Sequence, residues 1–475
     1  MINITIAWIA LPFFLGFVIF LFPKLDRYLS LGIALASTAY ALQLFVYSSP
    51  LTLQLLDNFG VTLAIDQLSA YFILTNGLVT LAVILYCWYS DKSAFFYAQI
   101  AMLHGSVNAT FVSSDLISLY VALEVLSIAG FLLIAYPRTD RSIWVGLRYL
   151  FVSNVAMLFY LVGAVLAYQA NHSFGFAALR GAPTEAFALI FMALLVKGGV
   201  FVSGLWLPLT HSESESPVSA LLSGVVVKAG VFPLMRCALI LNEIEPLIRL
   251  FGVATALMGV FYAVFEKDTK RMLAFHTISQ LGFVLAAPQV GGFYALTHGL
   301  VKSALFLIAG VLPSRNFKDL QQQPINTTIW IALLIASLSI SGLPLLAGFG
   351  AKVLTMKNMM PWQEIAMNIA AVGTAISFAK FIFLPRGGQG EVSPGFLPAV
   401  ILLIGGLVVA NVVYYEAYTL ANIPKAIATI GVGWLAYFLI FQKLVVKLPR
   451  VLEQFEHLIG VMSLTLIAIF WMVLA

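Results

Sequence analysis

The stretch AFALIFMALLVKGGVFVSGLW, residues 186–206, is long and apolar enough to cross a bilayer as a helix, yet it carries Lys197 at its centre. No acidic residue lies within ten positions of Lys197 to neutralise it locally. An ammonium group at bilayer depth costs about 2.5–3.5 kcal/mol on insertion scales. The stretch therefore predicts a membrane helix whose charged side chain faces other protein groups or water inside a helix bundle.

The same pattern recurs along the chain. Four more hydrophobic segments place a charged residue near their midpoints: Glu124, Lys228, Lys302 and Lys352. Five unpaired charges at bilayer depth would cost on the order of 15 kcal/mol, so we expect them to face one another or water. A row of buried titratable groups is what a proton pathway requires.

Composition supports a polytopic membrane protein. The chain has 475 residues, of which 61% are hydrophobic and 9% charged, and its mean hydropathy is +1.00. A soluble protein of this length cannot bury so much apolar surface. We expect an all-α fold of 14–16 transmembrane helices joined by short connections, so the sequence offers no place for a cofactor, a metal ion, or a redox or hydrolytic site. Sixteen spans are predicted, near residues 4–22, 28–47, 68–89, 94–112, 116–135, 143–168, 186–206, 217–240, 247–265, 272–288, 291–311, 327–358, 362–384, 397–416, 424–441 and 457–474.

The longest connection, residues 48–66, alternates hydrophobic and polar residues around the DNFG sequence at 57–60. This pattern predicts a short surface hairpin.

The distribution of basic residues predicts the orientation of the chain. Of the 25 Lys and Arg residues, fifteen lie in connections that follow odd-numbered spans, five lie on the opposite side, and five lie within spans. Connections rich in Lys and Arg stay in the cytoplasm, so we expect both termini on the non-cytoplasmic side.

Two of the spans that carry lysines also contain helix-breaking residues. Gly198 and Gly199 follow Lys197, while SGLP at 341–344 and GFG at 348–350 precede Lys352. Proline removes a backbone donor and glycine lets the backbone unwind, so discontinuous helices are expected near 197–204 and 342–350.

The two broken spans are five helices apart, and an odd offset reverses direction across the membrane. We therefore predict two inverted five-helix repeats, 94–240 (helices 4–8) and 247–384 (helices 9–13). Residues 1–93 (helices 1–3) and 397–475 (the C-terminal helices) would flank them.

Five motifs in order resemble those of the antiporter-like membrane subunits. They are LYVALEVLS at 119–127, WLPLTHSE at 206–213, SPVSALLSG at 216–224 followed by Lys228, KRMLAFH at 270–276 and HGLVKS at 298–303. This family includes subunits of respiratory complex I, of its photosynthetic relatives and of the Mrp-type multi-subunit sodium/proton antiporters. The SPVSALLSG sequence is most similar to the Mrp-type D subunit.

The resemblance implies a role for each buried group. Glu124 would modulate Lys197, the central proton-exchanging lysine, since burial favours a neutral lysine and a nearby carboxylate favours the charged form. The rest of the implied pathway consists of Lys228 as the relay to the second half, His298 and Lys302 along the bundle axis, and Lys352 as the terminal exchange group. The family often has a proline and a histidine shortly after the central lysine, where this chain has Val202 and Gly204.

Two interpretations are open for the other histidines near the predicted path and for Glu213. His276 would serve proton uptake or cap a helix at the interface. His211 and Glu213, expected in the cytoplasmic loop after span seven, would stabilise that loop or take up protons. Asp66 and Asp115 are predicted to cap helix N-termini.

Two functions remain open at this stage. The first is a proton-translocating subunit of an Mrp-type Na+/H+ antiporter. The second is a proton-pumping membrane subunit of an NADH or ferredoxin:quinone oxidoreductase, coupled to electron transfer elsewhere. Either implies other membrane subunits as partners, in a bacterial-type inner (plasma) membrane or a thylakoid membrane. A scaffold that has lost transport is the third interpretation, which the buried charges disfavour.

Overall fold

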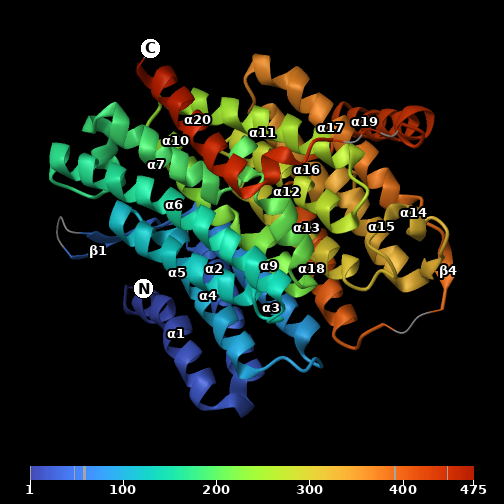
Figure 1. Ribbon diagram of the computed structural model, residues 1–475, viewed down its shortest axis with the longest axis horizontal. Coiled ribbons are helices and arrows are strands. Elements are labelled where there is room, and N and C mark those ends of the chain that lie inside the picture. The colour runs from blue at the N-terminus through green and yellow to red at the C-terminus, as the bar shows by residue number, and fades with distance from the viewer. Residues whose placement is uncertain are drawn as a thin grey trace.

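The computed structural model describes residues 2–47, 49–56, 60–389, 392–444, 446 and 448–474. The described chain is almost entirely helical, with α1 at one side of the molecule and α15 at the other (Figure 1). Each of the sixteen predicted spans coincides with a helix or an interrupted helix of the described chain.

The N-terminal third begins with two apolar helices and a hairpin. Its elements are α1 (Ile2–Leu21), α2 (Asp26–Val46), β1 (Leu51–Leu56), β2 (Gly60–Ile65), α3 (Gln67–Cys87), α4 (Ala94–Val112), α5 (Leu116–Ile134) and α6 (Asp140–Asn171). The antiparallel pairing of β1 with β2 confirms the predicted hairpin, whose turn at 57–59 lies outside the described residues. Asp66 and Asp115 accept the backbone N–H groups of Ser69 and Ser118, which confirms both predicted caps.

The middle third contains the most interrupted part of the chain. Its elements are α7 (Thr184–Lys197), the 3₁₀ turn η3 (Phe201–Gly204), α8 (Leu207–Glu213), α9 (Ser216–Leu221), the π turn η4 (Leu222–Val226), α10 (Lys228–Ile240), α11 (Glu245–Phe265), α12 (Thr269–Ala286) and α13 (Gly291–Ala309). Three short 3₁₀ segments elsewhere, η1 (Pro23–Leu25), η2 (Phe176–Gly181) and η5 (Tyr415–Ala417), lie in connections.

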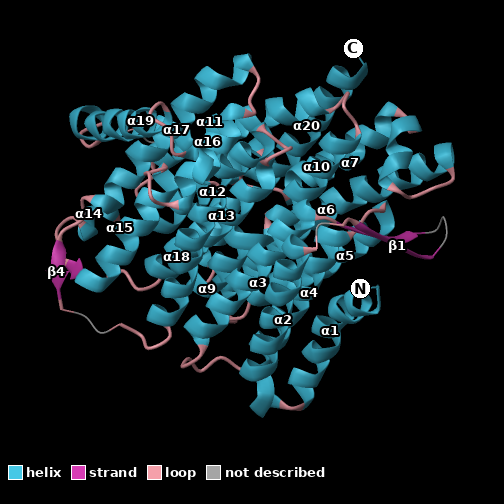
Figure 2. Ribbon diagram, turned by 180° about the vertical axis from the view of Figure 1, so that it is seen from behind, coloured by secondary structure: helices cyan, strands magenta, loops and turns pink. Residues whose placement is uncertain are grey.

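The C-terminal third completes the bundle. Its elements are α14 (Phe317–Leu320), β3 (Ile325–Asn326), α15 (Thr327–Ser341), α16 (Ala347–Lys357), α17 (Pro361–Ile382), β4 (Arg386–Gly388), α18 (Phe396–Val413), α19 (Asn422–Ala436), the π turn η6 (Tyr437–Phe441), the 3₁₀ turn η7 (Val451–Glu453) and α20 (Phe455–Leu474). Figure 2 shows how little strand the fold contains besides its helices.

Both predicted helix breaks are present. The α7 and η3–α8 segments meet at a bend of 43°, where Gly199 has φ +62° and Phe201 has φ +52°. The bend therefore forms although the chain has Val202 instead of the family's proline. The second break separates α15 from α16 at Gly342, whose φ is +90°. Gly348 and Gly350 lie inside α16 and do not break it, and Gly348 packs closely on α15, where a Cβ would lie 1.8 Å from the Ser339 carbonyl oxygen.

A third interruption is the π turn η4, directly before Lys228, where a continuous helix was expected. Gly224 in this turn packs so closely on α13 that a Cβ there would lie 2.2 Å from Ser303 Oγ. The π turn thus combines a widened backbone with close contact to the next helix, a geometry that hydrophobic pattern alone does not reveal.

Burial divides the bundle into a centre and a periphery. All residues of α12 and α13 are buried, and so are most residues of the Ser216–Ile240 span, whereas most of α1, α19 and α20 faces outward. Twelve helices of the described chain are long and apolar enough to cross a membrane, or thirteen with the bent α7–α8 pair. These central helices carry three of the six predicted pathway residues, Lys228, His298 and Lys302.

Candidate functional site

Lys197 is the last residue of α7, and only 7% of its surface is exposed. Its Nζ donates to the Leu123 carbonyl at 3.2 Å and to the hydroxyls of Ser127 and Ser153, which lie 2.9 Å apart. Sequence reasoning missed both serines as ligands of the ammonium group. Ser127 follows Glu124 by one helical turn, which was the available signal.

Glu124 lies in α5, close enough to Lys197 for electrostatic interaction. The two side chains form no ion pair within 4.0 Å, although both residues are described, and Glu124 Oε1 is buried without a hydrogen-bond partner. The Lys197 ammonium points instead at neutral oxygens of α5 and α6. A carboxylate that is near but not bonded can still bias the protonation of Lys197.

Lys228 begins α10 and is fully buried. Its Nζ donates to two carbonyls of the preceding turn, Ser223 at 3.3 Å and Gly224 at 2.5 Å. Two residues later Gly230 packs directly on the break beside Lys197, where a Cβ would lie 2.1 Å from the Gly198 nitrogen. The helix that carries Lys228 therefore contacts the backbone at the first break.

His298 and Lys302 lie one turn apart on α13. Lys302 Nζ donates to the Leu273 carbonyl at 2.5 Å. Both His298 nitrogens are buried without a hydrogen-bond partner in the described structure, and this ring lies within electrostatic range of Lys228, Lys302 and His276. The structure brings these groups together although separate segments of the chain supply them.

His276 is fully buried, with its ring 4.6 Å from that of Phe378, and neither ring nitrogen has a described partner. Interfacial capping is therefore the wrong interpretation, because His276 lies seven residues into α12, roughly 10 Å from its start. It lies within electrostatic range of Lys302 and Lys352, two predicted pathway lysines, and of Lys380.

Lys352 lies in α16 just after the second break, and its Nζ donates to the Ser341 carbonyl at 3.0 Å. It lines a cavity of about 280 Å³, which is also lined by Lys357, Glu364 and Lys425. Glu364 and Lys425 form an exposed ion pair at 3.3 Å. The terminal predicted group is thus adjacent to a space with further charged residues that sequence reasoning missed.

The predicted loop after span seven is a helix. His211 lies in α8 and is fully buried, 5.6 Å from the Phe306 ring, so its placement in an exposed loop was wrong. WLPLTHSE continues the broken span, because Pro208 occupies the first turn of α8, where proline is tolerated. Glu213 lies near the surface and pairs with Arg141 at 3.4 Å.

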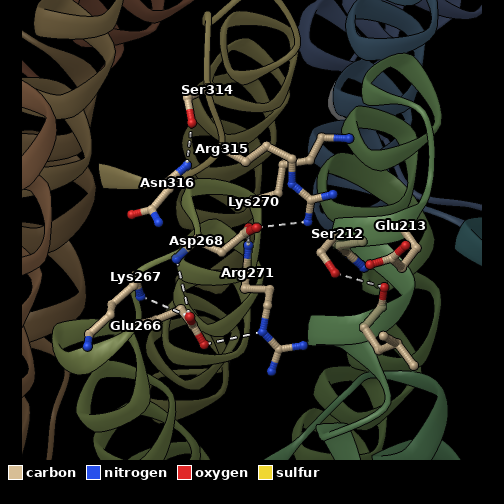
Figure 3. A network of polar contacts seen from close by, with 12 residues as sticks. Ser212, Glu213, Glu266, Lys267, Asp268, Lys270, Arg271, Ser314, Arg315 and Asn316 are labelled. Atoms are coloured by element: carbon tan, nitrogen blue, oxygen red, sulfur yellow. Dashed lines mark hydrogen bonds and ion pairs between the residues drawn. The ribbon is translucent and has the colours of Figure 1, made fainter. Parts of the chain in front are cut away.

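A polar network covers the start of α12 (Figure 3). Arg271 pairs with Glu266 at 3.2 Å and with Glu453 at 2.6 Å, while Arg315 pairs with Asp268 at 2.9 Å. Lys270 Nζ donates to the Ser214 carbonyl at 2.7 Å. The network joins α12 to the α8–α9 connection and to the C-terminal segment, and only the fold brings Glu453 to Arg271.

Comparison with known proteins identifies the family of the chain. The profile of the family described as NADH:quinone oxidoreductase/Mrp antiporter, TM, matches residues 113–377. The D subunit of the Na(+)/H(+) antiporter of Alkalihalophilus pseudofirmus is 29% identical over 434 residues, covering 82% of this chain and 88% of that protein. The N subunit of the NADH-quinone oxidoreductase of Desulforudis audaxviator is 29% identical over 365 residues, covering 68% and 72%.

Two solved structures share the fold. A chain of the archaeal membrane-bound sulfane sulfur reductase, a respiratory membrane complex, has a TM-score of 0.77 at 21% identity, covering 91% of this chain and 98% of that chain. A chain of the Mrp complex from Dietzia sp. has a TM-score of 0.74 at 20% identity, covering 96% and 99%. With the family profile spanning more than half of its length, this chain is an integral membrane protein of the NADH:quinone oxidoreductase/Mrp antiporter family.

Proposed function

We propose that this chain is the proton-translocating subunit of an Mrp-type multi-subunit cation/proton antiporter, with Na+ as the cation. The observation that carries the proposal is the row of buried lysines, three of which stand beside helix interruptions: Lys197 at Gly198, Lys228 after η4, and Lys352 after Gly342. The similarity to the D subunit of an antiporter supports the choice of assembly.

The proposed path begins at the Glu124–Lys197 pair and passes to Lys228, His298 and Lys302. His276 then links Lys302 to Lys352, since it interacts electrostatically with both. His211 and Glu213 are assigned auxiliary roles near proton uptake. The cavity beside Lys352 provides the exchange with the aqueous phase.

The interrupted helices give the transfer a physical basis. A helix break leaves backbone carbonyls without their usual partners, and lysine ammonium groups at Lys228 and Lys352 bind such oxygens. These neutral acceptors leave the ammonium charge uncompensated. The free-energy cost of deprotonating each lysine is therefore modest. We also propose that residues 94–240 and 247–384 form inverted repeats around this path, with both termini on the non-cytoplasmic side.

The test is proton movement in inverted membrane vesicles that contain the complete assembly. On addition of Na+, the proposal predicts proton release from loaded vesicles by the wild type and none by Lys197→Ala. Antiport would be contradicted if proton movement did not depend on Na+ in vesicles with the wild type or in vesicles with Lys197→Ala.

The alternative is a proton-pumping membrane subunit of an NADH or ferredoxin:quinone oxidoreductase. The similarity to the N subunit of an oxidoreductase and the fold of a respiratory complex chain favour it. In that case proton uptake into the same vesicles would require an electron donor and a quinone. Addition of Na+ alone would release no protons.

A further inference from the structure

A long apolar recess lies between α11 and α17. Its volume is about 820 Å³, and it is lined by hydrophobic side chains that include Leu257, Phe261 and Ile369, with Phe441 of η6 at one end. Along α17 it extends from Ile365 to Ile376, a rise of about 16 Å. That length is about half of a 30 Å hydrocarbon core, so the recess matches one leaflet and is too short to seat a transmembrane helix.

A polar cavity of about 310 Å³ adjoins the recess, and Phe265 lines both. Glu266, Lys267, Arg450 and Glu453 also line this cavity. An apolar channel of one-leaflet length that ends in a charged cavity has the polarity of a phospholipid, with acyl chain and head group at opposite ends.

The charges of the polar cavity favour an anionic head group. Both carboxylates are already engaged, since Arg271 pairs with Glu266 and Glu453, and Arg450 reaches Glu266 at 3.5 Å. Burial raises the pKa of Glu266, but Arg271 and the backbone N–H groups of Lys267 and Asp268 outweigh that effect and hold this pKa below its ordinary value.

The cations remain available to a ligand. Arg450 is 64% exposed. The Lys267 ammonium points away from the network (Figure 3), and it forms no ion pair with another described residue. Arg271, Lys267 and Arg450 together outnumber the two carboxylates, which leaves a surplus of positive charge at the mouth of the recess.

We propose that this chain binds one anionic phospholipid here, with an acyl chain between α11 and α17 and its phosphate at Lys267 and Arg450. α19 packs on α17 and α20 packs on α7, so the two C-terminal helices leave this face of α11 open between them. Between η6 and α20, the described residues Val446, Leu448, Arg450 and Glu453 line the head-group end.

Native mass spectrometry of the purified full-length protein tests the proposal. Phosphatidylglycerol and phosphatidylcholine with identical acyl chains are added to the delipidated protein at equal concentrations. We expect one molecule of phosphatidylglycerol to be retained in preference to phosphatidylcholine. Each of Lys267→Gln and Arg450→Gln should weaken this retention about fivefold, and both together about 25-fold, since each basic residue near an anionic surface contributes about 1 kcal/mol.

A second variant tests the recess itself. Ile369→Trp should fill it and reduce retention of both lipids, whereas Val409→Trp, on the similarly exposed outer face of α18, should change neither. Equal retention of the two lipids, unaffected by Lys267→Gln, would overturn the proposal.

A photo-crosslinker at position 369 gives an independent test in native membranes. Labelling of another polypeptide rather than of lipid would overturn the proposal too, since a partner helix would then cover this face.

Discussion

Within the described part of the chain, the Lys197 side chain donates hydrogen bonds only to neutral oxygens, the Leu123 carbonyl and the Ser127 and Ser153 hydroxyls. Such acceptors orient the amine in either protonation state, whereas a bonded carboxylate would trap the proton. This environment suits a group that loads and releases protons in turn.

Lys197→Ala is expected to abolish cation-driven proton flux in vesicles while leaving the amount of assembled complex unchanged. Lys197→Arg should fail as well, because a guanidinium does not release its proton near neutral pH. Lys318→Ala, at an exposed position in the short helix α14, serves as the control and should transport normally. Wild-type flux by Lys197→Ala would remove this residue from the pathway.

Glu124 supplies a charge near Lys197 without bonding to it. Glu124→Gln should therefore weaken proton loading of Lys197, since burial then acts without its compensating anion. Glu124→Asp keeps the charge with a shorter side chain and should retain partial activity.

The flux should therefore fall in the order wild type, Asp, Gln, and the Gln loss should be partly relieved at lower pH, where loading is easier. Flux measured against pH in vesicles checks this order. A Gln variant that matched the wild type at every pH would make Glu124 a packing residue.

At the scale of elements, the second break depends on the conformation of Gly342. Its φ of +90° is unfavourable for a residue with a side chain, and a Cβ at this position would lie 3.0 Å from Lys352 Cδ. The break therefore sets both the backbone geometry and the position of the terminal lysine.

Gly342→Ala should destabilise the protein by about 1–2 kcal/mol and reduce transport, because the break becomes strained and Lys352 is displaced. Gly405→Ala in α18 is the matched control, since a Cβ there meets nothing within 4 Å. Thermal unfolding in detergent should show a lower midpoint for the first variant and an unchanged or raised midpoint for the second. Equal midpoints and equal flux would show that this break tolerates a side chain.

At the scale of the whole molecule, the C-terminal segment joins the two halves of the bundle. It leaves η6 beside α17 and returns as α20, which packs on α7 and η3. On the way Glu453, only 8% exposed, pairs with Arg271, and its carbonyl accepts from Arg148 of α6. The start of α12 and the broken α7 are thus connected through a segment remote from both in sequence.

Glu453→Gln should lower the stability of the folded chain by about 2 kcal/mol, because a charged hydrogen-bond partner of buried Arg271 is lost. Glu456→Gln, an exposed position in α20, should have little effect. Thermal unfolding of the purified protein in detergent distinguishes the two. An unchanged midpoint for Glu453→Gln would mean that Glu266 alone satisfies Arg271.

The class of fold, the spans and the two helix breaks could be predicted from the sequence. These features follow from local properties, namely the length of apolar runs, the cost of a mid-membrane lysine, and the backbone freedom of glycine. The hairpin of β1 and β2 and the caps at Asp66 and Asp115 were predictable for the same reason.

Which groups meet depends on the tertiary fold and could not be predicted from the sequence. The hydroxyls at Lys197, the burial of His211 and His276, and the Arg271–Glu453 pair depend on contacts between segments far apart in the chain. The π turn before Lys228 likewise depends on the close approach of α13 at Gly224. Hydrophobic periodicity reports that a face is buried, but it carries no information about the neighbour that buries it.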